Sequence, residues 1–198
     1  MKSIYIYGAS GHGLVVADIA KVCGYTEIIY IDDGLNKHLT FDEIKENTEI
    51  PIAFGIGNNT IRKKLFEKAE KYGFTIITLI HSSAIISESV TIQEGAVLMP
   101  NVVINTKSNI GKGAILNTAC VVEHESIIED FVHISPNVSL AGNVRIKKCT
   151  HIGINSTVIQ GVIVGKNCII GAGSVIVSNI RDNTLSYGNP CKTIKEIK

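Results

Sequence analysis

The chain is 198 residues long with a formal net charge of +1, which is enough for one large domain or two small ones. This charge balance gives no electrostatic basis for binding nucleic acid or an anionic membrane surface, and we expect neither partner. Apolar residues make up 45% of the chain and aromatic residues only 6%, which favours β structure packed with branched aliphatic side chains.

No segment of the sequence indicates export or membrane insertion. The apolar run at the N-terminus stops at Gly8, short of a signal peptide, and no stretch approaches the roughly 20 apolar residues that cross a bilayer. The cysteines have no CxxC spacing, which argues against a disulfide framework or a thiolate zinc site. The sequence therefore predicts a cytoplasmic protein with reduced cysteines.

The first part of the chain is typical of a small nucleotide-binding α/β unit. Its predicted elements are a strand over 4–7, a glycine-rich loop over 8–13, a helix over 14–22 and a strand over 27–31. A glycine-rich loop at a helix N-terminus presents backbone N–H groups and the positive end of the helix dipole to phosphate. The glycine spacing differs from the dinucleotide fingerprint and the unit is short, so we do not expect NAD.

Two acidic residues follow the second strand of this unit. Asp32 and Asp33 stand about 20 positions after the glycines, where a carboxylate accepts hydrogen bonds from a ribose or a base. The remaining predicted elements are a strand over 52–56, a loop over 57–59, a helix capped by Thr60 and running to about Tyr72, and a strand over 74–79. We therefore expect a Rossmann-like nucleotide-sugar-binding domain at residues 1–80.

The rest of the chain repeats with a period of six. An aliphatic residue returns at every sixth position, namely Ile86, Ile92, Leu98, Ile104, Ile110, Leu116, Val122, Ile128, Ile134, Leu140, Ile146, Ile152, Val158, Val164, Ile170 and Ile176. An α-helix cannot keep such a period on one face, because its repeat is 3.6 residues. A six-residue unit fits one flat side of a triangular coil, so three units close a coil and the aliphatic side chains point to its axis.

This pattern resembles the hexapeptide-repeat acyltransferases, whose repeats form a left-handed parallel β-helix. The resemblance covers roughly residues 84–192, and it implies a β-helix domain over residues 81–198 that includes a C-terminal tail. It also implies a homotrimer in which acetyl-CoA, the co-substrate, lies in the groove between two neighbouring prisms.

Several motifs are similar to one branch of that family. They are the loop Gly-Ala-Ser-Gly-His-Gly, the pair Asp32-Asp33, the turn Gly57-Asn58-Asn59, and the segments 122–125 and 141–144. Together they resemble bacterial enzymes that acetylate the 4-amino group of UDP-4-amino-4,6-dideoxy-N-acetylglucosamine, giving UDP-N,N′-diacetylbacillosamine for glycan assembly. Relatives in that branch acetylate GDP-perosamine or a sialic acid hydroxyl, and both acceptors remain alternatives.

The resemblance also implies roles for individual residues. The catalytic residues are His124, as general base, and Glu125, which tunes that base. The residues implied to hold the nucleotide sugar are Ser10, Gly11, His12, Asp32, Asp33 and Gly57. Those implied to contact acetyl-CoA are His133, Gly142, Ile154 and Ala172, the last of which stands where relatives often carry glycine.

The proposed chemistry explains why a histidine between two acids is a good candidate. Acetyl transfer to an amine needs a proton acceptor, and histidine is the side chain best suited to accept a proton near pH 7. Glu123 and Glu125 favour the protonated ring that forms, and either one orients the ring if it reaches Nδ1. His124 follows the inward-pointing Val122 by two places, so we expect it on a prism face, exposed or at an interface.

A metal-dependent hydratase and a non-catalytic scaffold are alternatives from other functional classes. His133 and His151 are three repeats apart, so they should occupy the same place on successive coils, where stacked histidines invite a metal. The trimeric carbonic anhydrases of this fold also carry a His-x₄-His pair, which this sequence lacks, and we expect no metal. A scaffold would leave the Glu-His-Glu segment and the glycine loop without a purpose.

Overall fold

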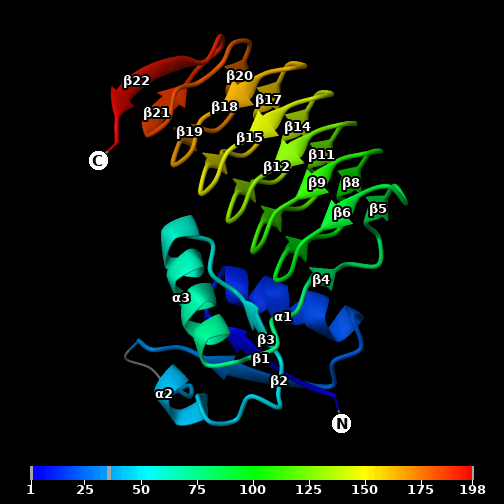
Figure 1. Ribbon diagram of the computed structural model, residues 1–198, viewed down its shortest axis with the longest axis vertical. Coiled ribbons are helices and arrows are strands. Elements are labelled where there is room, and N and C mark those ends of the chain that lie inside the picture. Colours follow the sequence, from blue (N-terminus) through cyan, green and yellow to red (C-terminus); the bar gives the residue numbers. More distant parts are fainter. Residues whose placement is uncertain (1, 35–36, 198) are drawn as a thin grey trace.

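The computed structural model describes residues 2–34 and 37–197, and it consists of two parts (Figure 1). A small α/β domain formed by the N-terminal part of the chain lies below a stack of β coils. The predicted fold class, a Rossmann-like α/β domain followed by a parallel β-helix of hexapeptide repeats, is confirmed. At the junction, β4 (Leu79–Ile80) pairs with β7 (Val97–Leu98) of the coils, and the domain limits 1–80 and 81–198 remain our proposal.

The N-terminal domain is a three-stranded parallel sheet between helices. Its elements are β1 (Ser3–Tyr7), α1 (His12–Val22), β2 (Glu27–Ile31), α2 (Phe41–Ile44), β3 (Ile52–Phe54) and α3 (Asn59–Lys71), and the strand order is β2-β1-β3. Ile4 and Ile6 of β1 pack in one cluster with α1. Tyr5 and Tyr7 belong to a second cluster with α2 and α3, so both faces of the central strand are buried, as is typical of parallel sheets.

The start of α3 differs from the prediction. Its N-cap is Asn58 and not Thr60, because the Asn58 side-chain oxygen accepts a hydrogen bond from the Ile61 N–H group at 3.0 Å. Both residue types are good caps, but Asn58 comes first and already satisfies one of the free N–H groups of the first turn. The helix therefore begins earlier than predicted.

Two other local elements also differ from the prediction. The strand predicted over 74–79 is reduced to an isolated bridge between Ile76 and Ile52, and its last residue belongs to β4. The short helix α2 was not predicted. It begins with a capping box, in which the Glu43 carboxylate accepts a hydrogen bond from the Thr40 N–H group at 2.7 Å.

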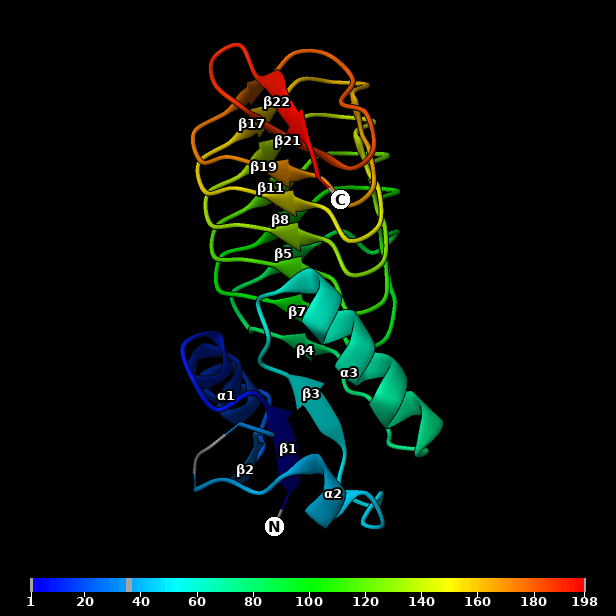
Figure 2. The same ribbon diagram turned by 90° about the vertical axis from the view of Figure 1, so that its left-hand side faces the viewer.

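The β-helix has three sides, and its coils stack along one axis (Figure 2). Sheet I contains β4, β7, β10 (Ile115–Leu116), β13 (His133–Ile134), β16 (His151–Ile152), β19 (Ile169–Ile170), β21 (Thr184–Tyr187) and β22 (Lys192–Glu196). Sheet II contains β5 (Ile85–Ile86), β8 (Val103–Ile104), β11 (Val121–Val122), β14 (Ser139–Leu140), β17 (Thr157–Val158) and β20 (Val175–Ile176). Sheet III contains β6 (Thr91–Ile92), β9 (Asn109–Ile110), β12 (Ile127–Ile128), β15 (Arg145–Ile146) and β18 (Ile163–Val164).

The sequence repeat explains how the coils pack. The second residue of each two-residue strand is the repeating aliphatic residue, and every one from Leu98 to Ile176 is buried. Small polar residues enter the core after some turns, and their hydroxyl groups form hydrogen bonds within the coils. For example, the Ser126 hydroxyl donates to the Ala141 carbonyl at 3.3 Å. The axis is therefore a continuous apolar column to which each coil contributes the same three positions.

The two domains share a packed boundary along sheet I. Helix α1 lies in one apolar cluster with Val97, Met99 and Ile115 of the first coils. Helix α3 rises beside the coils (Figure 2), and its Phe66 ring meets Phe131 edge-on with centroids 5.3 Å apart. The N-terminal domain is therefore fixed against one side of the β-helix.

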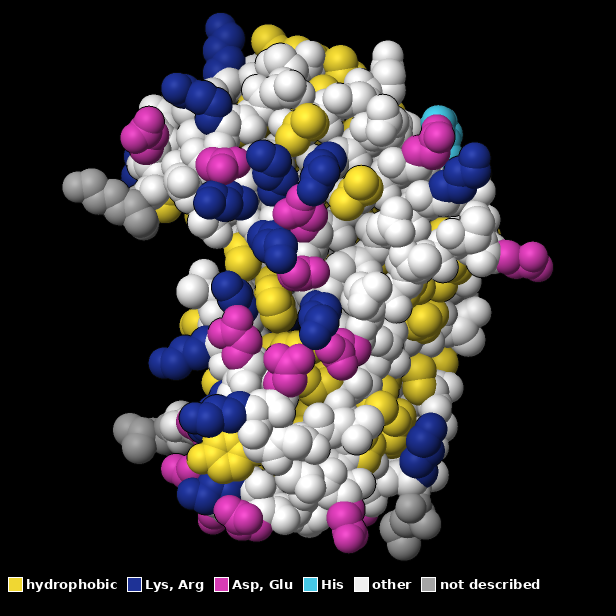
Figure 3. Space-filling view, in the orientation of Figure 1, with side chains coloured by type: hydrophobic (Ala, Val, Ile, Leu, Met, Phe, Trp, Pro, Cys, Tyr) yellow, Lys and Arg dark blue, Asp and Glu magenta, His cyan; other side chains and the backbone are white. Residues whose placement is uncertain are grey.

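The outer surface of the coils carries charged side chains of both signs (Figure 3). Arg145 pairs with Glu129 at 2.6 Å, and Lys148 pairs with Asp130 at 2.8 Å. Within residues 2–34 and 37–197, no helix has the length and hydropathy required to cross a membrane.

Candidate functional site

His124 lies at a corner of the prism and not on the flat face predicted for it. It sits in the turn between β11 of sheet II and β12 of sheet III. Its side chain is 53% exposed, which agrees with the predicted exposure. Glu125 Oε2 lies 3.1 Å from His124 Nδ1, so the expected contact between a carboxylate and the ring is present. No residue in the described part of the chain hydrogen-bonds to Nε2, which leaves that nitrogen free.

Gly142, on the next coil, forms the floor beneath this ring. A Cβ atom at this position would lie 2.5 Å from both Cε1 and Nε2 of His124, far inside normal contact distance. The Asn143 N–H group donates to the His124 carbonyl at 2.8 Å, which ties the two turns together. The position of the imidazole therefore leaves no room for a Cβ atom at residue 142, whereas the backbone angle there is not one reserved for glycine.

The glycine-rich loop lies on the other side of the molecule, between β1 and α1. A Cβ atom on Gly13 would lie 1.9 Å from the Gly8 carbonyl oxygen, and one on Gly55 would lie 2.4 Å from the Gly13 Cα atom. These glycines allow the loop to pack against the end of β3. Ser10 and Gly11 stand exposed at the tip of the loop.

Asp32 and Asp33 follow β2, as predicted, and border a small cavity beside the loop. This cavity has a volume of about 230 Å³ and is lined by Tyr7, Gly8, Asp32, Asp33, Gly34, Ile56, Ile61 and Leu65. Asp32 accepts hydrogen bonds from the backbone N–H groups of Ala9, at 3.2 Å, and Gly34, at 2.9 Å. The cavity thus combines apolar walls with an anchored carboxylate, which is suited to one part of a nucleoside.

Asp33 is held in place by three groups. It accepts hydrogen bonds from the Tyr7 hydroxyl and from the Phe41 N–H group, the latter at 2.8 Å, and it pairs with Lys68 at 3.5 Å. Burial alone would raise the pKa of Asp33, but these hydrogen bonds and the ammonium group outweigh burial and lower it. Asp33 is therefore ionised at neutral pH.

Three histidines meet where the loop faces sheet I. His133 and His151 stack with their centroids 4.7 Å apart and their planes 4° apart, which confirms that they occupy the same place on successive coils. His12, the first residue of α1, meets His133 at 5.9 Å. The His12 Nε2 atom is the only buried side-chain polar atom without a hydrogen-bond partner among the described residues.

Burial keeps these rings neutral. Burial, with a smaller effect of the positive charge of Arg62, lowers the pKa of His12 to about 4. Burial, with smaller effects of His151, Arg62 and His12, lowers the pKa of His133 to about 3. His133 Nδ1 lies 3.3 Å from the Gly57 carbonyl and its Nε2 lies 3.2 Å from the Asn117 amide nitrogen. A neutral ring that donates through Nδ1 and accepts at Nε2 satisfies both contacts.

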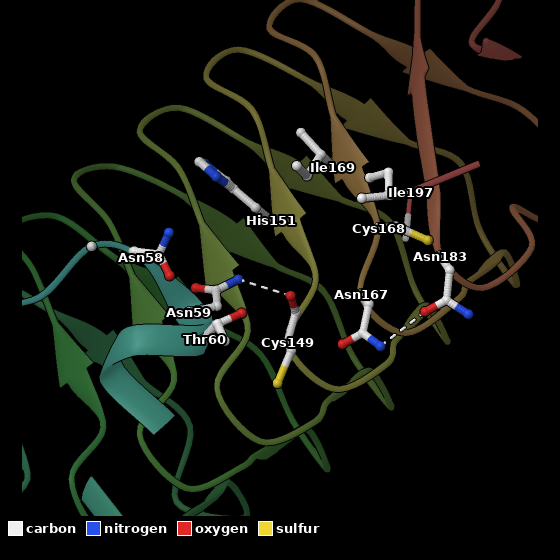
Figure 4. A pocket seen from close by; sticks show the side chains of 11 residues that line it. Asn58, Asn59, Thr60, Cys149, His151, Asn167, Cys168, Ile169, Asn183 and Ile197 are labelled. Carbon is white, nitrogen blue, oxygen red and sulfur yellow. Dashed lines mark hydrogen bonds between the residues drawn. The ribbon is translucent and has the colours of Figure 1, made fainter. Parts of the chain in front are cut away.

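A larger cavity lies on sheet I beside the N-terminus of α3 (Figure 4). Its volume is about 420 Å³, and its lining includes Gly57, Asn58, His151 and Ile169. Asn59 closes one wall by donating to the Cys149 carbonyl at 3.0 Å. Gly57 is the only predicted site residue that lines this cavity.

The residues predicted to contact acetyl-CoA fall at three places on the β-helix. Gly142 lies with His124 at the corner between sheets II and III. Ile154, which is 44% exposed, and Ala172 lie at the corner between sheets I and II. His133 lies on sheet I and is almost completely buried.

The predicted base and the predicted nucleotide-sugar loops are not brought together within one chain. Gly57 and His12 face sheet I, through the contacts with His133. The corner that holds His124 joins the other two sheets, so it is the corner across the prism from sheet I. The structure therefore places the two groups of predicted site residues on opposite sides of the same coils.

Sequence reasoning missed Arg62, which is 1% exposed and belongs to the boundary between the domains. The charged residues around it on α3 indicate a solvated helix face, so the sequence offered no signal for its burial. Within the described ranges, no group of three or more His, Cys, Asp or Glu side chains is placed to hold a metal ion.

Comparisons with known proteins cover both domains. Residues 3–69 match the PglD N-terminal domain, and residues 143–178 match the bacterial transferase hexapeptide repeat. The chain is 28% identical to a GDP-perosamine N-acetyltransferase of Escherichia coli O157:H7, over 85% of this chain and 82% of that protein. It is 34% identical to a UDP-N-acetylbacillosamine N-acetyltransferase of Bacillus subtilis (strain 168), over 50% of this chain and 52% of that protein.

Solved structures with the same architecture extend over nearly the whole chain. The acetyltransferase domain of PglB from Neisseria gonorrhoeae, in complex with acetyl coenzyme A, superposes with a TM-score of 0.91 at 36% identity and covers 98% of this chain and 99% of that one. A perosamine N-acetyltransferase from Caulobacter crescentus, in complex with CoA and GDP-perosamine, superposes with a TM-score of 0.93 at 32% identity, covering 98% and 97%.

Proposed function

The chain belongs to the nucleotide-sugar N-acetyltransferases built on hexapeptide repeats, which use acetyl-CoA, and we propose that its acceptor is UDP-4-amino-4,6-dideoxy-N-acetylglucosamine. Acetylation of the 4-amino group then gives UDP-N,N′-diacetylbacillosamine. The similarity that supports a UDP-linked acceptor is the 34% identity, over 50% of this chain, to the UDP-N-acetylbacillosamine N-acetyltransferase of Bacillus subtilis.

The observation that carries the proposed chemistry is the His124 ring lying on Gly142, with Nδ1 toward Glu125 and Nε2 free. The neutral 4-amine attacks the thioester carbonyl, so that a C–N bond forms and the C–S bond breaks. His124 Nε2 accepts the proton that the amine loses and passes it to the departing thiolate, while Glu125 stabilises the ring when it is charged. A positioned base of this kind contributes about 10²- to 10⁴-fold to the rate.

The glycine-rich loop and its neighbours are the proposed site for the nucleotide sugar. Ser10 and Gly11 offer an exposed loop tip at the start of α1, where a pyrophosphate is favoured. A hydrogen bond from the substrate would satisfy the unpartnered Nε2 atom of His12. Asp32 and Asp33 bind the base or the ribose in the smaller cavity, and Gly57 lies beside the sugar.

We propose a homotrimer because one chain holds two separate half-sites. A neighbouring copy that packs against sheet II can bring its own nucleotide-sugar loops to His124. The outer face of sheet II is suited to such packing, because four of its six outward-facing strand residues are aliphatic and Ile85 is 68% exposed. The four are Ile85, Val103, Val121 and Val175, and the other two are Ser139 and Thr157. Packing of this face around a threefold axis gives a closed assembly.

The trimer also unites the residues proposed to contact acetyl-CoA. Gly142 borders one edge of sheet II, and Ile154 and Ala172 border the other. Where three copies pack through sheet II, the first edge of one copy meets the second edge of the next. The groove between them places the thioester beside His124, with His133 of the second copy behind the same edge.

GDP-perosamine is the second candidate acceptor. It is favoured by the E. coli GDP-perosamine N-acetyltransferase, which aligns over 85% of this chain, and by the Caulobacter structure in complex with GDP-perosamine. Both candidates require the same base and the same acetyl donor, so they differ only in the nucleoside cavity and the sugar.

The decisive test measures release of free thiol from acetyl-CoA with each acceptor in parallel. The proposal predicts rapid turnover with the UDP-linked amino sugar and at least about 100-fold lower kcat/KM with GDP-perosamine, a loss of about 2.7 kcal/mol. The reverse preference would reassign the acceptor and leave the acetyltransferase chemistry intact.

A further inference from the structure

Arg62 is a buried cation whose partners are carbonyl groups and not carboxylates. It lies in the first turn of α3 and is 1% exposed, and it forms no ion pair with a described acid. Its Nε donates to the Gly113 carbonyl at 2.8 Å. Its Nη1 donates to the carbonyls of Ile56 and Gly57, at 3.0 and 3.2 Å. Its Nη2 donates to Asn59 Oδ1 at 2.8 Å and to the carbonyls of Phe131 at 2.9 Å and Val132 at 3.4 Å.

The acceptors on the β-helix follow its repeat. Gly113 and Phe131 are the second residues of successive turns between sheets III and I, and both adopt a left-handed conformation with φ of 56°. Cys149 occupies the same position on the next coil, with φ of 58°, and its carbonyl accepts the hydrogen bond from Asn59. The first turn of α3 thus contacts one equivalent carbonyl on each of three coils, which are spaced by about 4.8 Å.

The acceptors in the N-terminal domain are the carbonyls of Ile56 and Gly57, in the loop that follows β3. In the proposed function, this loop lies beside the nucleotide sugar. Ile56 lines the nucleoside cavity, and Gly57 lines the larger cavity and contacts His133. One guanidinium therefore holds both this loop and the coils. Burial of an unpaired cation is unfavourable, and only the planar, multi-donor guanidinium can reach so many carbonyls at once. A lysine would reach a subset of them from a single nitrogen.

We propose that Arg62 is a positioning residue for acetyl transfer, which fixes the Ile56–Gly57 segment against three coils and so sets the place of the nucleotide sugar. This inference rests on the proposed function, in which these loops hold the substrate. Asn59 helps to hold the same arrangement. Its side-chain oxygen accepts a hydrogen bond from Arg62, and its side-chain nitrogen donates one to the Cys149 carbonyl of the coils.

The charge of Arg62 acts on the same neighbourhood. The titratable groups facing it are His12, His133, His151 and Cys149, and the charge lowers the pKa of each histidine in addition to the effect of burial. Neutral rings stack without mutual repulsion, so the geometry and the charge both favour a fixed arrangement of the loop.

The test compares Arg62→Lys with a matched control on the same helix–coil boundary. Lys112→Met removes an exposed contact between α3 and the coils, in which Lys112 pairs with Glu70 at 3.3 Å. In the full-length protein, we expect Arg62→Lys to raise the KM for the nucleotide sugar about 10-fold or more, with the KM for acetyl-CoA unchanged. We expect Lys112→Met to keep both KM values within about twofold.

A merely structural role would lower the unfolding midpoint of Arg62→Lys and leave both KM values of the folded enzyme unchanged, and that result overturns the inference. If Arg62→Lys does not fold, Asn59→Ala decides by the same criterion, with an expected rise in KM of about threefold. UDP affinity by calorimetry is measured on the same variants. Absence of turnover in the wild type would refute the proposed function, whereas unchanged UDP affinity in the variants would refute the role of Arg62.

Discussion

The molecule contains two histidine sites whose surroundings are opposite. At the corner between sheets II and III, His124 is half exposed and contacts the Glu125 carboxylate. At the boundary between the domains, His12 and His133 are buried near the Arg62 guanidinium, and their pKa values fall to about 4 and 3. Burial and the nearby cation keep the boundary rings neutral, whereas the corner ring is open to solvent.

This contrast assigns different work to the same side chain. A base must carry a positive charge during the reaction, so the corner setting suits catalysis. A neutral ring instead offers one donor and one acceptor with fixed geometry, so the boundary setting suits the positioning of a loop or a ligand. The similarity of the motif around His124 to the family is therefore not enough to establish the role of this histidine, because the same residue type has different roles in the two settings.

Removal of His124 should have the largest effect. We expect His124→Ala to lower kcat by about 10²- to 10⁴-fold, because the base is lost, while the unfolding midpoint stays close to that of the wild type. Release of free thiol and thermal unfolding measure the two quantities. His81→Ala is the matched control, because the only side-chain partner of His81 among the described residues is Ser83. Near-wild-type kcat/KM in His124→Ala would remove the corner from the mechanism.

A methyl group under the ring should be nearly as harmful. We expect Gly142→Ala to lower kcat by about 10- to 100-fold, because its Cβ would lie 2.5 Å from two ring atoms of His124 and displace the base. The double variant with His124→Ala should be no slower than His124→Ala alone. A further loss in the double variant would mean that Gly142 acts independently of the ring.

The boundary histidines should make stability depend on pH. The unfolded chain takes up protons below about pH 6.5, but the folded chain resists them until its lower pKa values are reached. Their contribution is therefore fully present above pH 6.5 and is lost as the pH falls toward 4 and then 3. We expect a loss of a few kcal/mol in the free energy of unfolding, measured by chemical denaturation at a series of pH values.

One variant sharpens this measurement. His133→Gln should flatten the pH dependence, because glutamine keeps hydrogen-bonding groups without titrating. A pH dependence as steep as that of the wild type would show that His133 does not contribute to it.

Loss of the carboxylate beside the base should have the smallest of these effects. We expect Glu125→Gln to lower kcat by about 10-fold with KM unchanged, because the glutamine side chain still reaches Nδ1 but carries no charge. Steady-state kinetics at saturating acetyl-CoA measure the change. A kcat equal to that of the wild type would show that the charge of Glu125 does not contribute to the rate.

The coils are well predicted from the sequence because every six-residue repeat has an aliphatic residue at the same position. An aliphatic residue at every sixth position fits one side of a triangular coil. The repeating aliphatic residues between Leu98 and Ile176 are all buried along the axis. Local elements are less determined. Asn58 and Thr60 are both good helix caps, and only the hydrogen bond to Ile61 decides between them.

The site is predictable only in part, because it depends on docking between distant segments. The contact of His124 with Glu125 and the stacking of His133 on His151 follow from short or repeated spacings. The approach of His12 to that stack depends on how the domains pack, and the buried Arg62 that joins them has no signature in the sequence. The separation of the two half-sites likewise follows from which corner each turn occupies.

In the proposed trimer, one copy supplies His124 and its neighbour supplies the nucleotide-sugar site, which includes the loop at Gly57. Two inactive variants test this arrangement: His124→Ala removes the base, and Gly57→Trp blocks the loop. A Cβ atom at Gly57 would meet no atom within 4 Å, so the new side chain can leave the backbone without a clash. The variants are unfolded together, refolded in equal amounts, and assayed for release of free thiol. Random trimers should recover about a quarter of the wild-type activity, because one site in each mixed trimer has both parts intact. Mixed trimers with no activity would contradict the shared site.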